Sequence, residues 1–297
     1  MIDLDKKKID RIIRAALKED IGPGDITSRS VIDRFLNASA VIVSRQKAVL
    51  CGVNIIERVF SAVDCSLKFR PVVKDGDNIE PEQEIAFIEG NAQAILKGER
   101  TALNFLGMLS GTAFRTHKLK ELVKDTRVKI YDTRKTVPLN RYLQKYAVTV
   151  GGGYNHRKGL WDMVLLKDNH IKAFGMQKKI SDSAIVIKEI IKKSRENVQK
   201  NIKIEIEVET LKECEYALQE KPDVIMLDNM TPETVLHAVE LRNRKGLEQK
   251  VIFEVSGGIT KDNIMNYAKT GVDIISIGSL TASVDPVDFS LEVIFRK

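Results

Sequence analysis

The spacing of apolar residues predicts an amphipathic helix over residues 5–19. Apolar side chains recur there at intervals of three and four positions, which places them on one helical face: Ile9, Ile12, Ile13, Ala16 and Leu17. The sequence IGPGD follows at residues 21–25. Glycine and proline in close succession favour a turn, so we expect the helix to end there.

The pattern changes to short β segments between residues 38 and 97. Apolar residues come in brief runs, with the turn sequences KDGDN and EGNA among them, as in strands joined by tight turns. The expected β segments are 38–53, 66–79 and 84–96. A long helix is predicted next, over residues 98–124, GERTALNFLGMLSGTAFRTHKLKELVK.

Beyond residue 127 the pattern alternates between strand and helix. The apolar runs that predict strands are 128–131, 162–166, 203–208, 223–227, 251–255 and 273–277, and helical patterns separate the later ones. Such alternation is typical of a parallel sheet covered by helices. The number of units predicts a small or incomplete (β/α) barrel, and a doubly wound open sheet is the alternative.

Composition is that of an ordinary globular protein. Of 297 residues, 43% are hydrophobic and 30% charged, and no apolar run approaches the roughly 20 residues that span a bilayer. The start MIDLDKKKID has no apolar signal-peptide core, and the three cysteines lie far apart without metal-site spacing. We therefore expect a cytoplasmic protein with reduced thiols and no membrane partner.

The net charge of +7 raises the question of nucleic acid binding. Most lysines, however, alternate with acids on expected helix faces, no zinc-finger spacing occurs, and aromatic residues make up only 6% of the chain. A nucleic-acid-binding protein would need a concentrated basic surface or a stacking platform. We expect no nucleic acid partner.

Polar residues follow the predicted barrel strands. After the six strands, in order, come Asp132, Thr133, Arg134 and Lys135; Lys167, Asp168, Asn169 and His170; Glu209; Asp228 and Asn229; Ser256, Gly257 and Gly258; and Gly278 and Ser279. The carboxyl ends of the strands of a (β/α) barrel meet at one mouth, where active sites form. The sequence therefore predicts an active site built from these strand ends.

A set of cations at these positions points to a strongly anionic ligand. The set is Arg134, Lys135, His156, Arg157 and Lys167, which supplies four fixed charges and one imidazole. Arginine binds carboxylates and phosphates through planar, bidentate contacts. Converging cations repel one another unless an anion completes the site.

Three glutamates alternate along one predicted strand and share one of its faces: Glu205, Glu207 and Glu209. A strand in the middle of a parallel sheet has both faces covered, so these carboxylates are not simply solvated. Together with Asp228 they suit Mg²⁺ shared with substrate phosphates. Strand parity does not choose among the three glutamates.

The last two strand ends carry the sequences SGGI and IGSLT. Glycine lets backbone N–H groups approach a phosphate closely. The loops after the last two strands of a barrel often bind phosphate. A phosphate site is therefore expected there.

Eight sequence motifs resemble the quinolinate phosphoribosyltransferase family, also known as carboxylating nicotinate-nucleotide pyrophosphorylases. They run in family order over nearly the whole chain: EDIGPGDITS (19–28), GERTALNFLGMLSGTA (98–113), YDTRKTVPLNRYLQKYAV (131–148), GGGYNHRKGLWDMVLLKDNHI (151–171), IEIEVETL (204–211), VIMLDNM (224–230), EVSGGI (254–259) and SIGSLT (276–281). The resemblance implies an N-terminal α/β sandwich domain at residues 1–112, joined by 283–297, and an incomplete α/β barrel at 113–282.

The reaction implied by the resemblance joins quinolinate to 5-phosphoribosyl 1-pyrophosphate with Mg²⁺. It releases pyrophosphate and CO₂ and gives nicotinate mononucleotide on the route to NAD. Quinolinate is a dicarboxylate and the sugar donor carries phosphates, so both substrates match the predicted anion site.

Site residues are carried over from the family motif by motif. Arg134, His156, Arg157 and Lys167 would bind the quinolinate carboxylates, and Lys135, near Thr133, would reach the donor phosphates. Glu207 and Asp228 would face the ribose and the Mg²⁺–pyrophosphate, so Lys135, Glu207 and Asp228 are the expected catalytic residues. The 5-phosphate would lie against Ser256, Gly257, Gly258, Gly278, Ser279 and Leu280. A homodimer, or a hexamer of dimers, is expected, with Arg100 donated across the interface.

One stretch departs from the family pattern. Members often have Thr-Pro-Gly-Leu-Arg after the DTRKT motif, where this chain has Val137, Pro138, Leu139, Asn140 and Arg141. Without this glycine the loop has fewer accessible backbone conformations. A nicotinate phosphoribosyltransferase or a paralogue linked to molybdenum transport is the nearest rival, and the full cation set favours quinolinate.

Overall fold

The computed structural model describes residues 5–294, which fall into two compact units. Unit 1 comprises Met1–His117, Lys135–Gly153 and Ser279–Lys297, and unit 2 comprises Lys118–Arg134 and Tyr154–Gly278. The segment 135–153, which the sequence analysis assigned to the barrel, lies in unit 1.

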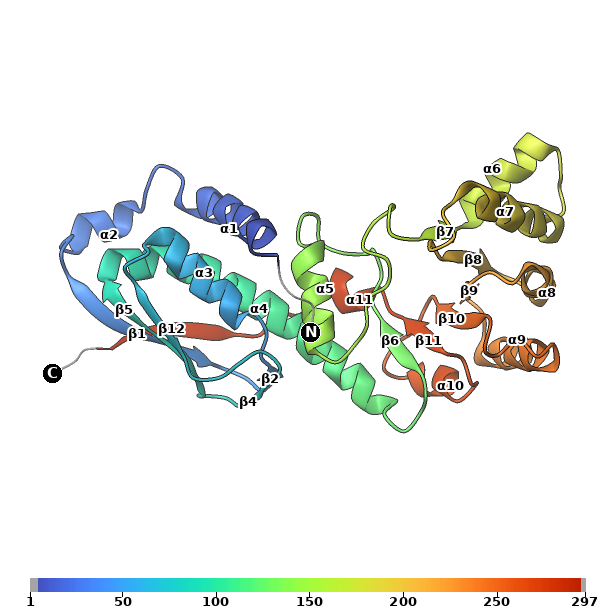
Figure 1. Cartoon of the computed structure of the whole chain (residues 1–297). Helices are drawn as coiled ribbons and strands as arrows, with labels where there is room; N and C mark the ends of the chain where they lie inside the picture. The colour runs from blue at the N-terminus through green and yellow to red at the C-terminus, as the bar shows by residue number, and fades with distance from the viewer. Residues whose placement is uncertain (1–4, 295–297) are drawn as a thin grey trace. The chain divides into compact units, whose positions relative to one another are not determined.

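Unit 1 is built on an antiparallel sheet with the strand order β12-β1-β5-β3. Its strands are β1 (Asn37–Ser44), β3 (Lys68–Pro71), β5 (Glu84–Asn91) and β12 (Phe289–Ile294), and β2 (Ala48–Val49) pairs with β4 (Asn78–Ile79) in a separate ribbon. The helices are α1 (Lys6–Ile21), α2 (Ile26–Val31), α3 (Val53–Val63), α4 (Ala92–Leu122), α5 (Arg141–Val150) and α11 (Ser279–Ala282) (Figure 1). The C-terminal strand thus returns to the sheet formed by the N-terminal part.

The predicted first helix is confirmed as α1. The Asp5 carboxylate accepts the backbone N–H of Lys7 at 2.9 Å, which caps the helix start. Gly22 ends the helix with φ +51°, a left-handed value that glycine adopts without strain. The apolar face, Ile9, Ile13 and Leu17, is buried, because α1 packs on α3.

The long helix α4 begins six residues before its predicted start. Asn91 ends β5, and its side-chain carbonyl accepts the N–H of Ala94 at 3.0 Å. This cap lets the helix start at Ala92. The β pattern predicted for residues 92–96 was therefore wrong, and Arg100 lies exposed within the helix rather than at its start.

Unit 2 contains six parallel strands in the order β6-β11-β10-β9-β8-β7. They are β6 (Lys129–Tyr131), β7 (Val164–Leu166), β8 (Ile204–Val208), β9 (Val224–Asp228), β10 (Ile252–Ser256) and β11 (Ile274–Ser276). The first strand pairs with the last, and no ladder joins β6 to β7 in the described chain. The barrel is therefore open between its first two strands, which confirms the incomplete barrel and excludes the doubly wound order.

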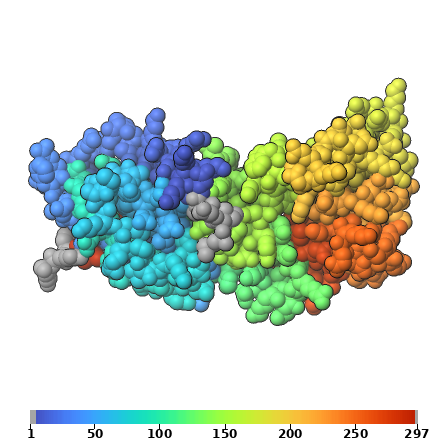
Figure 2. Space-filling model, viewed as in Figure 1, coloured from blue at the N-terminus to red at the C-terminus, as the bar shows by residue number. Residues whose placement is uncertain are grey.

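Helices cover the outer side of this sheet. They are α6 (Asp168–Lys178), α7 (Ser183–Asn197), α8 (Leu211–Glu220), α9 (Pro232–Arg244) and α10 (Ile264–Ala268), and Figure 1 shows α7, α8 and α9 beside the strands that they follow or precede. The connection between α6 and α7 projects from the rest of unit 2 in the space-filling view (Figure 2). Among residues 5–294, no helix combines the length and the apolar character that a membrane span requires.

Candidate active site

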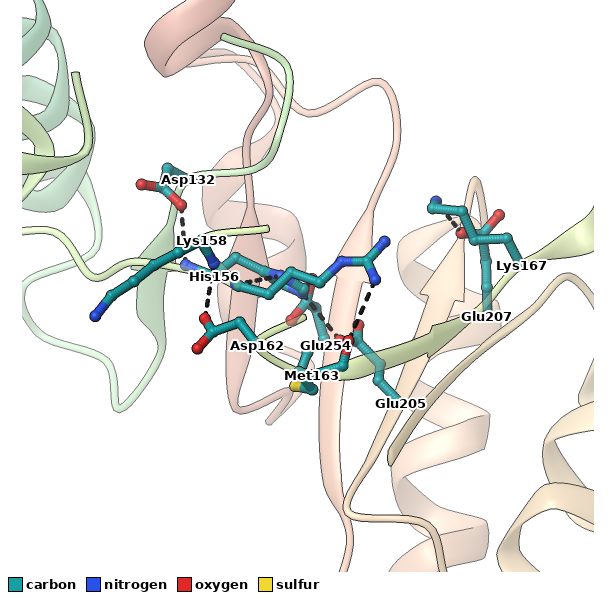
Figure 3. A network of polar contacts seen from close by, with 10 residues as sticks. Asp132, His156, Lys158, Asp162, Met163, Lys167, Glu205, Glu207 and Glu254 are labelled. Carbon is teal, nitrogen blue, oxygen red and sulfur yellow. Dashed lines mark hydrogen bonds and ion pairs between the residues drawn. The ribbon is translucent and has the colours of Figure 1, made fainter. Parts of the chain in front are cut away.

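An ion pair joins the ends of β7 and β8. Lys167, the residue after β7, places its Nζ atom 2.6 Å from Oε2 of Glu207 (Figure 3). Glu207 is nearly buried, with 8% of its surface exposed, whereas the Lys167 side chain is 43% exposed. The pair therefore has one end in the barrel interior and one end open to solvent and ligands.

Asp228 belongs to the same group. It is the last residue of β9, and its pKa is raised, first by burial and then by the neighbouring charge of Glu207, while Lys167 acts in the opposite direction. The side-chain amide of Asn229 donates to Asp228 at 2.6 Å. Two carboxylates and a lysine thus meet at neighbouring strand ends, as the sequence predicted.

Two arginines lie within electrostatic range of each other. Arg157 is only 8% exposed, and its pKa is lowered by burial and, next, by the positive charge of Arg134. One guanidinium N–H of Arg157 donates to the Met163 carbonyl at 3.3 Å, and its buried Nε atom has no hydrogen-bond partner. A second anion beside this guanidinium would offset both the burial and the repulsion.

His156 lies deeper, against two buried glutamates. Its Nε2 atom is 2.9 Å from Glu205 Oε2 on β8 and 3.6 Å from Glu254 Oε1 on β10 (Figure 3). Burial raises the pKa of both Glu205 and Glu254 to about 8. Glu254 was not among the predicted site residues, although a charged residue within the apolar strand IFEVS was a usable signal.

The tertiary structure separates the three alternating glutamates. Glu205 faces His156, Glu207 pairs with Lys167, and Glu209 is exposed beyond the strand. His170 caps α6, because its Nδ1 atom accepts the Lys167 backbone N–H at 3.0 Å. The His170 side chain is exposed. This contact indicates that His170 stabilises the start of α6 rather than lining the site predicted from the KDNH sequence.

The turn after β10 contains two consecutive glycines in the left-handed region of backbone conformation. Gly257 and Gly258 both have positive φ, +99° and +61°. A Cβ atom on Gly257 would lie 2.1 Å from Asn229 Oδ1, so only glycine fits. The following helices α10 and α11 have five and four residues, so the loop backbone, not a long helix dipole, would carry anion binding.

The remaining predicted residues lie on both units. Thr133 and Gly278 belong to unit 2, whereas Arg100, Lys135, Ser279 and Leu280 belong to unit 1. Within unit 1, Thr281 Oγ1 donates to the Lys135 carbonyl at 2.6 Å, which joins the start of α11 to the DTRKT segment.

The departure at Leu139 has a backbone consequence. Leu139 has φ +65° and is 90% exposed. The loop therefore keeps a left-handed residue where the family pattern has glycine, and leucine occupies it with some strain.

Comparison with known proteins covers almost the whole chain. A model described as quinolinate phosphoribosyl transferase, C-terminal domain, matches residues 112–292, and the model of the N-terminal domain matches residues 25–110.

Two relatives and one solved structure illustrate the similarity. A probable nicotinate-nucleotide pyrophosphorylase (carboxylating) of Methanocaldococcus jannaschii is 42% identical over 288 residues, or 96% of each chain. The nicotinate-nucleotide pyrophosphorylase (carboxylating) of Mycobacterium leprae is 35% identical over 95% of each chain. The structure of the nicotinate-nucleotide pyrophosphorylase from Francisella tularensis superimposes with a TM-score of 0.88 at 36% identity, covering 98% of both chains.

Proposed function

The chain belongs to the quinolinate phosphoribosyl transferase family, and we propose that it makes nicotinate mononucleotide for NAD biosynthesis. The reaction transfers phosphoribosyl from 5-phosphoribosyl 1-pyrophosphate to quinolinate and releases pyrophosphate and CO₂. The protein is therefore an enzyme, a decarboxylating phosphoribosyltransferase.

The buried Arg157 beside Arg134 is the observation that supports a dicarboxylate substrate best. Burial of the Arg157 guanidinium and its repulsion by Arg134 both disfavour its charged form, so an anion would stabilise it. Quinolinate carries carboxylates on adjacent ring carbons, and each can accept a pair of guanidinium hydrogen bonds. We assign Arg134, Arg157 and Lys167 to contact with the acid substrate, and His156, whose two ring nitrogens face Arg157 and Glu205, to the support of Arg157.

Glu207 and Asp228 suit the sugar donor and Mg²⁺. The pKa of Asp228 is raised first by burial and then by the charge of Glu207, and carboxylate oxygens are the ligands that Mg²⁺ prefers. Mg²⁺ bound to the pyrophosphate would neutralise the charge of the leaving group. In the same proposal, Lys135 and Thr133 contact the donor phosphates, and the 5-phosphate lies against Ser256, Gly257, Gly258, Gly278, Ser279 and Leu280.

The chemistry proceeds by displacement at the anomeric carbon. The pyridine nitrogen forms the new bond to C1 of the ribose while the C1–O bond to pyrophosphate breaks, and positive charge develops on the sugar. The nearly buried Glu207 carboxylate stabilises that charge. The C2 carboxylate then leaves as CO₂, its electron pair remains on the ring carbon beside the cationic nitrogen, and a proton takes its place.

The protein contributes mainly by holding the acid in place. Arg134 and Arg157 fix the orientation of the ring, which turns the attack at C1 into an intramolecular step. We further propose a cytoplasmic enzyme that assembles as a homodimer or a hexamer of dimers. Arg100, exposed on α4, is free to reach across an interface in such an assembly.

The experiment is a paired turnover assay. Purified protein is mixed with 5-phosphoribosyl 1-pyrophosphate, Mg²⁺ and either quinolinate or nicotinate, and both CO₂ and nicotinate mononucleotide are measured. Turnover with quinolinate alone, abolished by chelation of Mg²⁺, is the expected result. Turnover with nicotinate alone, or with neither acid, would assign the chain to a different activity on the same barrel.

A further inference from the structure

His156 connects strands that are not neighbours in the barrel. Its backbone N–H donates to the buried Asp132 carboxylate, just after β6, at 2.9 Å. Its ring reaches Glu205 on β8 and Glu254 on β10, both at most 1% exposed. Strands β6, β8 and β10 alternate around the sheet, so the ring lies in an interior layer of the barrel (Figure 3).

The hydrogen bonds of His156 determine its tautomer. The backbone N–H of Arg157 donates to Nδ1 at 2.8 Å, so Nδ1 acts as an acceptor and the ring proton of the neutral imidazole resides on Nε2. Nε2 then lies 2.9 Å from Oε2 of Glu205, as an ion-pair contact. Each ring nitrogen therefore faces a group of the protein, and the ring is fixed from both sides.

The same hydrogen bonds argue against a metal ion in this cluster. One histidine and two carboxylates within 4.8 Å of one another are a possible ligand set. A metal would need the lone pair of Nε2, but that atom carries the proton as long as Nδ1 accepts the Arg157 N–H. The cluster is better explained as a set of polar contacts that supports the histidine ring.

What the support holds is Arg157. The hydrogen bond from the Arg157 backbone N–H to His156 Nδ1 fixes the position of the Arg157 backbone. Glu205 also attracts the Arg157 guanidinium directly. Glu205 thus acts on Arg157 by two routes, through the imidazole and through its own charge.

We propose that Glu205 and Glu254 are positioning residues for the acid substrate, which clamp the His156 ring across the barrel interior and so aim Arg157 at a quinolinate carboxylate. The inference rests on the proposed function. It adds two residues that do not contact substrate, and it explains why charged groups lie inside a parallel sheet that would otherwise be filled by apolar side chains.

The test compares Glu205→Leu with Glu205→Gln. Leucine removes the carboxylate that faces His156 Nε2, whereas glutamine keeps an oxygen atom at that position. We expect Glu205→Leu to raise the KM for quinolinate by about tenfold or more, equivalent to ~1.4 kcal/mol. The KM for the sugar donor should stay within about twofold of the wild type, and Glu205→Gln should restore most of the quinolinate KM. Glu189→Leu, on the exposed face of α7, is the control for the substitution itself.

A double-mutant cycle tests whether Glu205 affects quinolinate binding through Arg157. In an Arg157→Met background, Glu205→Leu should add little to the quinolinate KM, because the residue that it aims is gone. Additive effects, equal rises in both KM values, or an unchanged quinolinate KM in folded Glu205→Leu would overturn the inference. If Glu205→Leu does not fold, Glu254→Leu is measured in the same way.

The wild-type protein provides a readout that needs no variant. Nitrogen NMR should show His156 with its proton on Nε2, and a proton on Nδ1 would contradict the proposal. A wild type that does not use quinolinate would overturn the proposed function and the inference together. An active wild type with the wrong tautomer or an unaffected Glu205→Leu variant would overturn the inference alone.

Discussion

Replacing Arg157 by methionine should change substrate binding and stability in different ways. Arg157 is 8% exposed, and its pKa is lowered by burial and by Arg134. Loss of one partner from a buried, hydrogen-bonded charge pair costs about 2–5 kcal/mol. We therefore expect kcat/KM for quinolinate to fall by roughly 30-fold to several thousand-fold, at ~1.4 kcal/mol for each tenfold.

The stability of the substrate-free protein should change far less. Methionine is close to arginine in length and removes both the desolvation of the cation and its repulsion by Arg134. Glu205 loses a cationic neighbour, but its pKa is already raised to about 8, so it can take up a proton at neutral pH rather than remain as an unpaired charge. We expect the free energy of unfolding to stay within ~1 kcal/mol of the wild type, because the two effects oppose each other.

Steady-state kinetics with each substrate varied in turn and thermal unfolding without substrate measure both effects. Arg127→Met, at an exposed position of unit 2, is the matched control. The reasoning is refuted if Arg157→Met keeps quinolinate kcat/KM within threefold of the control. It is also refuted if the variant unfolds far more easily, since the arginine would then be structural.

Three further perturbations test other parts of the structure. Gly257→Ala should raise the KM for the sugar donor and lower the free energy of unfolding by about 2 kcal/mol or more, because the new Cβ would lie 2.1 Å from Asn229 Oδ1. Gly246→Ala is the control for backbone strain alone, since Gly246 has φ +66° and no atom within 4 Å of the added Cβ. The pKa of Glu254 is raised from 4.5 to about 8, so the folded state binds this proton more tightly than the unfolded state, and its contribution to stability is lost as pH rises through about 8. Thermal unfolding from pH 4.5 to 8.5 should show a smaller decline for Glu254→Gln than for the wild type, and parallel curves would contradict the assigned shift. Leu139→Gly should raise the melting temperature by about 2–4 °C, because it relieves a left-handed leucine whose side chain is 90% exposed and packs on little; a lower melting temperature would show that the loop depends on leucine.

The local sequence pattern predicted an element correctly where only one structural environment would stabilise the segment. The short apolar runs of unit 2 became β6 to β11 within one or two residues of their predicted ends, because an apolar run between helical segments is stable only inside a covered parallel sheet. That the residues after those strands lie along one edge of the sheet was equally predictable. Parallel strands bring their carboxyl ends to one edge whatever the details of packing.

Local patterns failed where a neighbour distant in sequence or a single cap decided the outcome. Residues 92–96 alternate like a strand, yet the Asn91 cap starts a helix there. The positive φ at Leu139 could be anticipated only from the family pattern, since no propensity favours leucine in that conformation.

The glutamates of β8 show the division most clearly. The sequence by itself determined that Glu205 and Glu207 share one face of β8, because side chains alternate along every strand, whereas Glu209 lies just beyond the strand. Only the tertiary structure decided their partners, which come from distant segments of the chain: His156, which also contacts Glu254, for Glu205, and Lys167 for Glu207. Partner choice depends on strand order and register across the barrel, and those are set by long-range packing that no local pattern records.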